Sequence, residues 1–84
     1  MRTLADVGNA VSERRKALGL KQGFVAERAG VSQEFLSRLE KGRASEVGTR
    51  KLLTVLAVLG MELFLRPVGT AGGLDELRKE RSGQ

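Results

Sequence analysis

Glycine divides the first sixty residues of this chain into four segments with a helical pattern, at Gly19, Gly30, Gly42 and Gly60. Within the segments, apolar residues recur three or four positions apart, which is the spacing of one face of an α-helix. A glycine just past such a segment readily adopts the left-handed backbone conformation that ends a helix. The chain is therefore predicted to be all-α, a small bundle of four to five short helices.

The helices are expected at residues 3–18, 22–29, between Ser32 and Gly42, and at 49–59. Ser32 and Thr49 are the predicted N-caps of the third and fourth helices, because their hydroxyls can accept a hydrogen bond from the first turn. The fourth helix is apolar over most of its circumference. That composition predicts burial on several sides.

The sequence MELFLRPV, residues 61–68, alternates along its length with the period of a β-strand. A lone strand in a helical chain leaves its backbone donors and acceptors unpaired. We expect it to pair with the same strand of a second copy across a two-fold axis. The contacts would come from Met61, Leu63, Phe64 and Leu65. The alternative is an extended tail that lies on the core.

Three regions are predicted: a helical domain at 1–60, a dimerisation strand at 61–68 and a tail at 69–84. The tail starts with the linker GTAGG and continues as LDELRKERSGQ, which has a helix-forming composition but only two leucines to bury. We expect it to be disordered or frayed in isolation. Ordering against a partner is the alternative.

The chain has neither cysteine nor histidine, which excludes disulfides, thiolate metal sites and the commonest general base. No catalytic residue, metal site or cofactor is predicted, and an enzyme is not expected. The longest apolar run, residues 52–59, is too short to cross a membrane, and the N-terminus lacks the apolar core of a signal peptide. A cytoplasmic protein is expected, without membrane contact.

The positive charge lies in the predicted folded part. Residues 1–68 hold twelve Lys and Arg against seven Asp and Glu, which is the whole net charge of +5, whereas residues 69–84 have three of each sign. This distribution favours a polyanionic partner such as nucleic acid, although a small basic protein need not bind one.

The second and third helices, joined by residues 29–32, have the spacing of a helix-turn-helix. Gly30 suits the turn because glycine takes positive φ, and Val31 can fill the gap between the helices. With Leu36 and Leu39 turned inward, the third helix presents a polar face: Gln33, Glu34, Ser37, Arg38 and Lys41. This face starts at the helix N-terminus, the end that repressors of this type insert into the major groove.

Three pieces together resemble the XRE family of phage-repressor and Cro-like helix-turn-helix proteins, over residues 4 to about 60: VGNAVSERRKALGLKQ, VAERAGVSQEFLSRLEKG and LLTVLAVLG. The continuation MELFLRPV is similar, more particularly, to the HipB-like antitoxins and their solitary relatives. In that group a strand after the helical domain builds the dimer. The resemblance implies double-stranded operator DNA as the partner.

The family pattern implies DNA contacts at eight positions: Gln22, Ser32, Gln33, Glu34, Ser37, Arg38, Lys41 and Arg43. Gln22 would bond a phosphate and buttress the recognition helix. Gln33, Glu34 and Arg38 carry groups that can read adenine, cytosine and guanine, respectively. Lys41 and Arg43 would meet phosphates, and Lys21 and Arg14 are weaker candidates for the same contact.

Residue chemistry alone offers other interpretations of the same positions. Glu34 and Arg38 are four residues apart and can form a solvated surface pair. Ser32 and Ser37 can be only a cap and a small exposed residue. The resemblance also implies a partly buried ion pair of Arg15 with Glu40, whose role is structural.

The sequence departs from the family pattern at Lys21, Gly23 and Phe24, where a Ser or Thr cap and acidic residues are usual. Capping of the second helix is therefore expected to be weak, and Gly23 destabilises the helix by about 1 kcal/mol relative to alanine. Phe24 either packs locally over the first turn or serves a protein interface.

These features lead us to expect a homodimeric, sequence-specific transcriptional regulator that binds an inverted-repeat operator, with autorepression implied by the resemblance. It would lie in the nucleoid when bound to DNA. The alternative is a HipB-like antitoxin whose main act is to bind and neutralise a kinase-like toxin.

Overall fold

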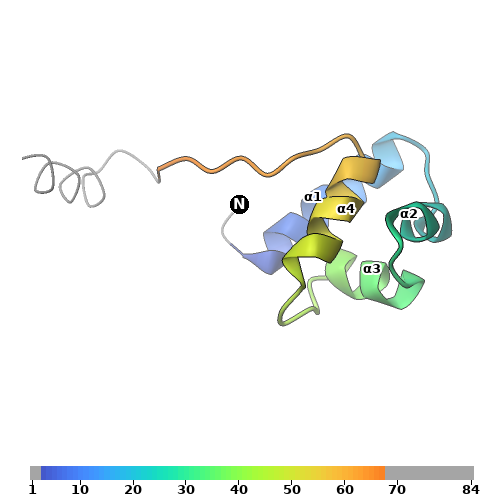
Figure 1. Cartoon of the computed structure of the whole chain (residues 1–84), viewed down its shortest axis with the longest axis horizontal. Helices are drawn as coiled ribbons and strands as arrows, with labels where there is room; N and C mark the ends of the chain where they lie inside the picture. Colours follow the sequence, from blue (N-terminus) through green and yellow to red (C-terminus); the bar gives the residue numbers. More distant parts are fainter. Residues whose placement is uncertain (1–2, 68–84) are drawn as a thin grey trace, which may run out of the picture.

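The fold, seen in a computed structural model that describes residues 3–67, has four helices and no strand in that range. They are α1 (Leu4–Ala17), α2 (Gln22–Ala29), α3 (Gln33–Glu40) and α4 (Thr49–Val58). Helix α1 packs against α3, and α2 packs against both α3 and α4 (Figure 1). The predicted all-α bundle is confirmed. The predicted tail at 69–84 lies outside the described residues.

All four helices end in the same backbone motif. The glycines after them have φ between 69° and 72°. At the end of α2, for example, Gly30 N–H donates to Glu27 O at 3.2 Å and Val31 N–H donates to Ala26 O at 3.0 Å, which is a Schellman motif. The predicted glycine stops are confirmed. The residue after the glycine packs against the core at Leu20, Val31 and Met61, whereas Arg43 in the same position after α3 is exposed.

The core contains apolar side chains from every helix: Val11, Val25, Ala26, Ala29, Phe35, Leu36, Leu39, Leu52, Val55, Leu56 and Leu59. Leu36 and Leu39 are fully buried, as predicted, and Val31 fills the turn between α2 and α3. Because the apolar side of α3 is held in this core, its polar side faces outward.

Two expectations for α4 are wrong. Its N-cap is Gly48, and Thr49 is the first helical residue, with no side-chain capping bond. The helix is also buried on one side only: Leu53 is 44% exposed. Three other short helices cannot surround α4, so its outward apolar residues remain at the surface of the single chain.

Helices α1 and α3 approach so closely at Gly8 that a side chain there has no room. A Cβ on Gly8 would lie 1.8 Å from the carbonyl oxygen of Leu39. Gly8 is buried in the middle of α1, although glycine is among the poorest helix formers. The close crossing explains this glycine, whose role the sequence patterns did not predict.

The segment after α4 leaves the bundle as an extended chain (Figure 1). Met61 N–H donates to Leu56 O at 2.8 Å, and the Met61 side chain packs against the core. Beyond it, Leu63, Phe64 and Leu65 are 47%, 77% and 89% exposed. Residues 62–67 are exposed in the single chain and do not pack on the core, in contrast to Met61. Strand pairing across a dimer stays a prediction.

Candidate nucleic-acid interface

The outward face of α3 carries the residues that the sequence predicted there. Gln33, Glu34, Arg38 and Lys41 are exposed, and Ser37 is half-buried. Ser32 is the N-cap, and its Oγ accepts a hydrogen bond from Phe35 N–H at 3.0 Å. This cap bond places Ser32 at the start of the helix and leaves the hydroxyl proton free to donate outward.

The outward residues of α3 have no polar partner in the part of the chain that the structure describes. Gln33, Glu34, Arg38 and Lys41 make no side-chain hydrogen bond or ion pair with any residue in the range 3–67. In particular, Glu34 and Arg38 do not form the surface pair that their spacing permits. Their donors and acceptors are therefore available to an external ligand.

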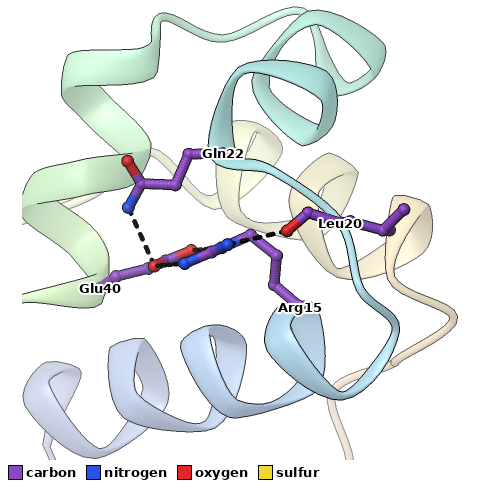
Figure 2. A network of polar contacts seen from close by, with 4 residues as sticks. All are labelled: Arg15, Leu20, Gln22 and Glu40. Carbon is purple, nitrogen blue, oxygen red and sulfur yellow. Dashed lines mark hydrogen bonds and ion pairs between the residues drawn. The ribbon is translucent and has the colours of Figure 1, made fainter.

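A partly buried polar network holds the other side of α3 in place (Figure 2). Arg15 of α1 forms two parallel bonds to Glu40 of α3: Nε to Oε2 at 2.7 Å and Nη2 to Oε1 at 2.9 Å. Arg15 Nη1 also donates to Leu20 O at 2.8 Å. The Arg15 and Glu40 side chains are only 12% and 4% exposed. A bidentate pair with this geometry fixes the angle of α3 as well as its position.

The charge state of this network is set by competing effects at Glu40. Burial alone would raise the pKa of the Glu40 carboxyl, but hydrogen bonds from Arg15 and Gln22, the Arg15 charge and a smaller contribution from Ser12 outweigh it, so the pKa lies below its ordinary value. The Glu40 hydrogen bond raises the pKa of Arg15. Both groups are therefore ionised near neutral pH.

Gln22 links α2 to the same network. Its Nε2 donates to Glu40 Oε1 at 3.0 Å, so the first residue of α2 is tied to the last residue of α3. Through this bond to Glu40, Gln22 supports α3, which is one of the two roles that the family pattern implies for it. The Gln22 carbonyl oxygen and second amide proton remain for other contacts, and the phosphate bond stays a prediction.

Of the two weaker phosphate candidates, Arg14 makes a hydrogen bond within the chain, and its phosphate contact stays a prediction. Its Nε donates to Leu59 O at 2.9 Å, which satisfies a carbonyl at the end of α4. Lys21 is the N-cap of α2 and makes no side-chain capping bond. The predicted weak capping of α2 is thereby confirmed.

The C-terminal end of α3 is flanked by exposed cations. Lys41 is the C-cap of α3, and Arg43 takes the position after the helix-ending glycine where the other three helices place an apolar residue against the core. Lys51 of α4, which the sequence reasoning missed, lies with its Nζ 5.4 Å from the centre of the Phe35 ring. Lys41 and Arg43 therefore place positive charge at the C-terminal end of α3, and Lys51 places it next to Phe35 in the first half of the helix.

Phe24 packs locally but stays at the surface. Its ring lies under the Arg28 guanidinium, 5.0 Å from ring centre to Cζ, and is 43% exposed. Phe24, Arg28 and Val58 line a shallow depression between α2 and α4. The partner over Phe24 is Arg28, one turn further along α2.

A comparison with protein-family models identifies the family of this chain. The model described as helix-turn-helix matches residues 11–65. The chain belongs to the XRE type of this helix-turn-helix family. In this helix-turn-helix protein α2 and α3 form the motif, and the protein is a DNA-binding transcriptional regulator. No significant match is found among curated proteins.

Two properties of the described helices concern membranes and metal ions. None of the helices within residues 3–67 is long and apolar enough to span a bilayer. The same residues contain no group of three side chains suited to hold a metal ion. The family match also extends through residues 61–65, into the segment that carries the predicted dimer contacts.

Proposed function

We propose that this XRE-type regulator binds an inverted-repeat operator as a homodimer, with α3 of each copy in the major groove, and represses its own gene. The observation that carries the proposal is the unpaired polar face of α3. Four exposed side chains that together carry both donors and acceptors have no partner in residues 3–67, whereas the buried polar groups there are all satisfied. Base edges in the major groove offer the matching groups.

In this proposal the residues of α3 make different DNA contacts according to their position along the helix. Gln33 and Glu34 stand in the first turn and would read adenine and cytosine, and Arg38, one turn later, would read guanine. Lys41 and Arg43 stand at the far end, where the helix leaves the groove, and would bond phosphates. Ser32 and Ser37 would add smaller contacts, and Gln22 would bond a phosphate from the start of α2.

The apolar surface of the single chain supports the homodimer. Leu63, Phe64 and Leu65 follow one another in extended backbone without ladder hydrogen bonds inside the range 61–67. Pairing with the same segment of a second copy would satisfy that backbone and cover these side chains. Two copies would also double the phosphate contacts and make half-site spacing part of the specificity.

The test is footprinting on the DNA immediately upstream of the gene, followed by binding of Gln33→Ala and Arg38→Ala to the protected site. Each variant should lose affinity by roughly 5- to 150-fold and should lose preference at one base pair per half-site. Arg28→Ala is the matched control, because it removes the same charge from α2 on the α4 side. Unchanged base preference in both α3 variants, with the fold intact, would refute the groove assignment.

A second candidate is the antitoxin function, in which the chain holds a kinase-like toxin and DNA binding is secondary. The observation that favours it is the exposed Phe24 ring beside Arg28 and Val58. Phe24→Ala should then weaken binding to a toxin encoded beside this gene while leaving operator binding within about twofold. If an adjacent toxin binds the variant as tightly as the wild type, this surface does not hold it.

A further inference from the structure

Gly23 is a glycine that the backbone of α2 does not require. It is the second residue of the helix and is not among the positive-φ glycines of the described chain. An added Cβ would meet no backbone atom of another helix within 4 Å, unlike the one at Gly8. Glycine lowers helix stability, and α2 already lacks a side-chain cap. A residue that breaks a local rule without a structural reason calls for a functional one.

The only group near the missing side chain belongs to the polar face of α3. An added Cβ would lie 3.5 Å from Gln33 Oε1 and 4.0 Å from Gln33 Cδ, with no other atom in the contact range. The Gln33 carboxamide therefore lies across residue 23, with its oxygen toward α2. The size of the side chain at position 23 therefore determines how much space the Gln33 carboxamide oxygen has.

We propose that Gly23 is a positioning residue for base recognition, in which the missing side chain keeps the Gln33 carboxamide oxygen open to the DNA base. This inference rests on the proposed function. A glutamine that reads adenine must accept a bond from N6 at its oxygen while its nitrogen donates to N7. Both groups must lie in one plane against the base edge, so a side chain that covers or displaces the oxygen removes the pair of bonds together.

The geometry also sets the size of group that is tolerated. A single methyl group at 3.5 Å is in ordinary van der Waals contact with Oε1, so alanine fits without moving Gln33. Valine adds two further carbons beyond the Cβ and is restricted in its χ1 rotamers within a helix. We expect these added carbons to crowd the carboxamide oxygen, which is the group from outside α2 that lies nearest to the Cβ position.

The experiment uses the full chain and duplexes enriched from randomised DNA by the wild type. Affinities for all single-base variants of the enriched site are measured for Gly23→Ala, Gly23→Val, Gln33→Ala and the Gly23→Val/Gln33→Ala double variant. Phe24→Val is the matched control, because it places the same branched residue one position on, beside Arg28. Thermal melts and affinity for unrelated duplex DNA check the fold and the phosphate contacts of each variant.

Gly23→Val should reduce the preference for the base pair read by Gln33 by about tenfold, and the double variant should lose no more than Gln33→Ala alone. Gly23→Ala and Phe24→Val should keep that preference within about twofold. A uniform loss for all sequences with Gly23→Val would overturn the inference, because it would mean that residue 23 only lets the backbone approach a phosphate. Retained preference with Gly23→Val would also overturn it.

The two proposals fail in different ways. If Gln33→Ala leaves the preference at every base pair unchanged, the reading of a base by Gln33 is wrong, and the role of Gly23 falls with it. If Gln33→Ala removes the preference at one base pair and Gly23→Val does not, the proposed function stands and only the inference about Gly23 is overturned.

Discussion

Replacing Gly8 by alanine tests the crossing of α1 and α3 that holds the recognition helix in place. The new Cβ would lie 1.8 Å from Leu39 O and 2.8 Å from Leu39 C. Contacts of a Cβ essentially never fall below 3.0 Å. The two helices must therefore separate by about 1 Å, since a backbone carbonyl within a helix cannot rotate away as a side chain can.

The expected destabilisation follows from two opposing effects. Overpacking of this kind costs about 1 to 3 kcal/mol, and the upper end applies because the obstacle is backbone. Alanine in place of glycine raises the free energy of unfolding by about 1 kcal/mol through its better helix propensity. The net loss is about 2 kcal/mol, which lowers the melting temperature of a domain of this size by roughly 8 to 16 °C.

The displacement should also reach the buried ion pair. The Cα of Glu40 lies 3.4 Å from the same added Cβ, so opening the crossing moves the end of α3 away from Arg15 of α1. The bidentate bonds would lengthen, and α3 would lose its fixed angle. Operator affinity should fall together with stability.

The assay is thermal unfolding followed by far-ultraviolet circular dichroism, with operator binding measured on the same samples. Gly23→Ala is the control, because it makes the same glycine-to-alanine change within a helix but meets only the Gln33 side chain at 3.5 Å. It should melt at or above the wild-type temperature. If Gly8→Ala does the same, the close approach of α1 and α3 does not exist in solution.

Four further predictions concern charge and assembly. Because the pKa of Glu40 lies below its ordinary value, the Glu40 carboxylate stabilises the fold fully above about pH 5, and this stabilisation is lost as the pH falls through the folded-state pKa. Urea denaturation should therefore show a loss of stability at acid pH in the wild type that is absent in Glu40→Gln. Either Arg15→Met or Glu40→Leu alone should destabilise by about 3 to 5 kcal/mol, and the double variant by less than either, because one removal leaves a buried charge unpaired; additive losses would argue against the pair. Lys41→Ala should weaken specific and non-specific DNA alike and reduce the salt dependence by about one unit, whereas a sequence-selective loss would contradict a phosphate contact. Deletion of residues 61–67 should give monomers in sedimentation, and a remaining dimer would remove the role of that segment.

The sequence by itself determined the helices and the polar face of α3. Helix ends depend on groups within a few residues of one another: the glycines that take positive φ, and the Ser32 hydroxyl that reaches Phe35 N–H. The outward residues of α3 followed from the burial of Leu36 and Leu39, because the helical period relates the two faces. The family resemblance supplied the pair of Arg15 and Glu40.

Local signals failed where a distant segment decides the outcome. Thr49 has a good capping side chain, yet the chain enters α4 at Gly48 without using it. Leu53 belongs to a segment that is apolar over most of its circumference, but the number of helices available to cover α4 limits its burial.

Only the tertiary structure decided how the helices sit against one another. The crossing at Gly8, the bond from Gln22 to Glu40 and the approach of Gln33 to the open side of Gly23 join groups on different helices. Their distances depend on the packed volumes of the whole core, which no periodicity encodes. The sequence therefore determines which residues α3 presents, and the packing determines the angle at which it presents them.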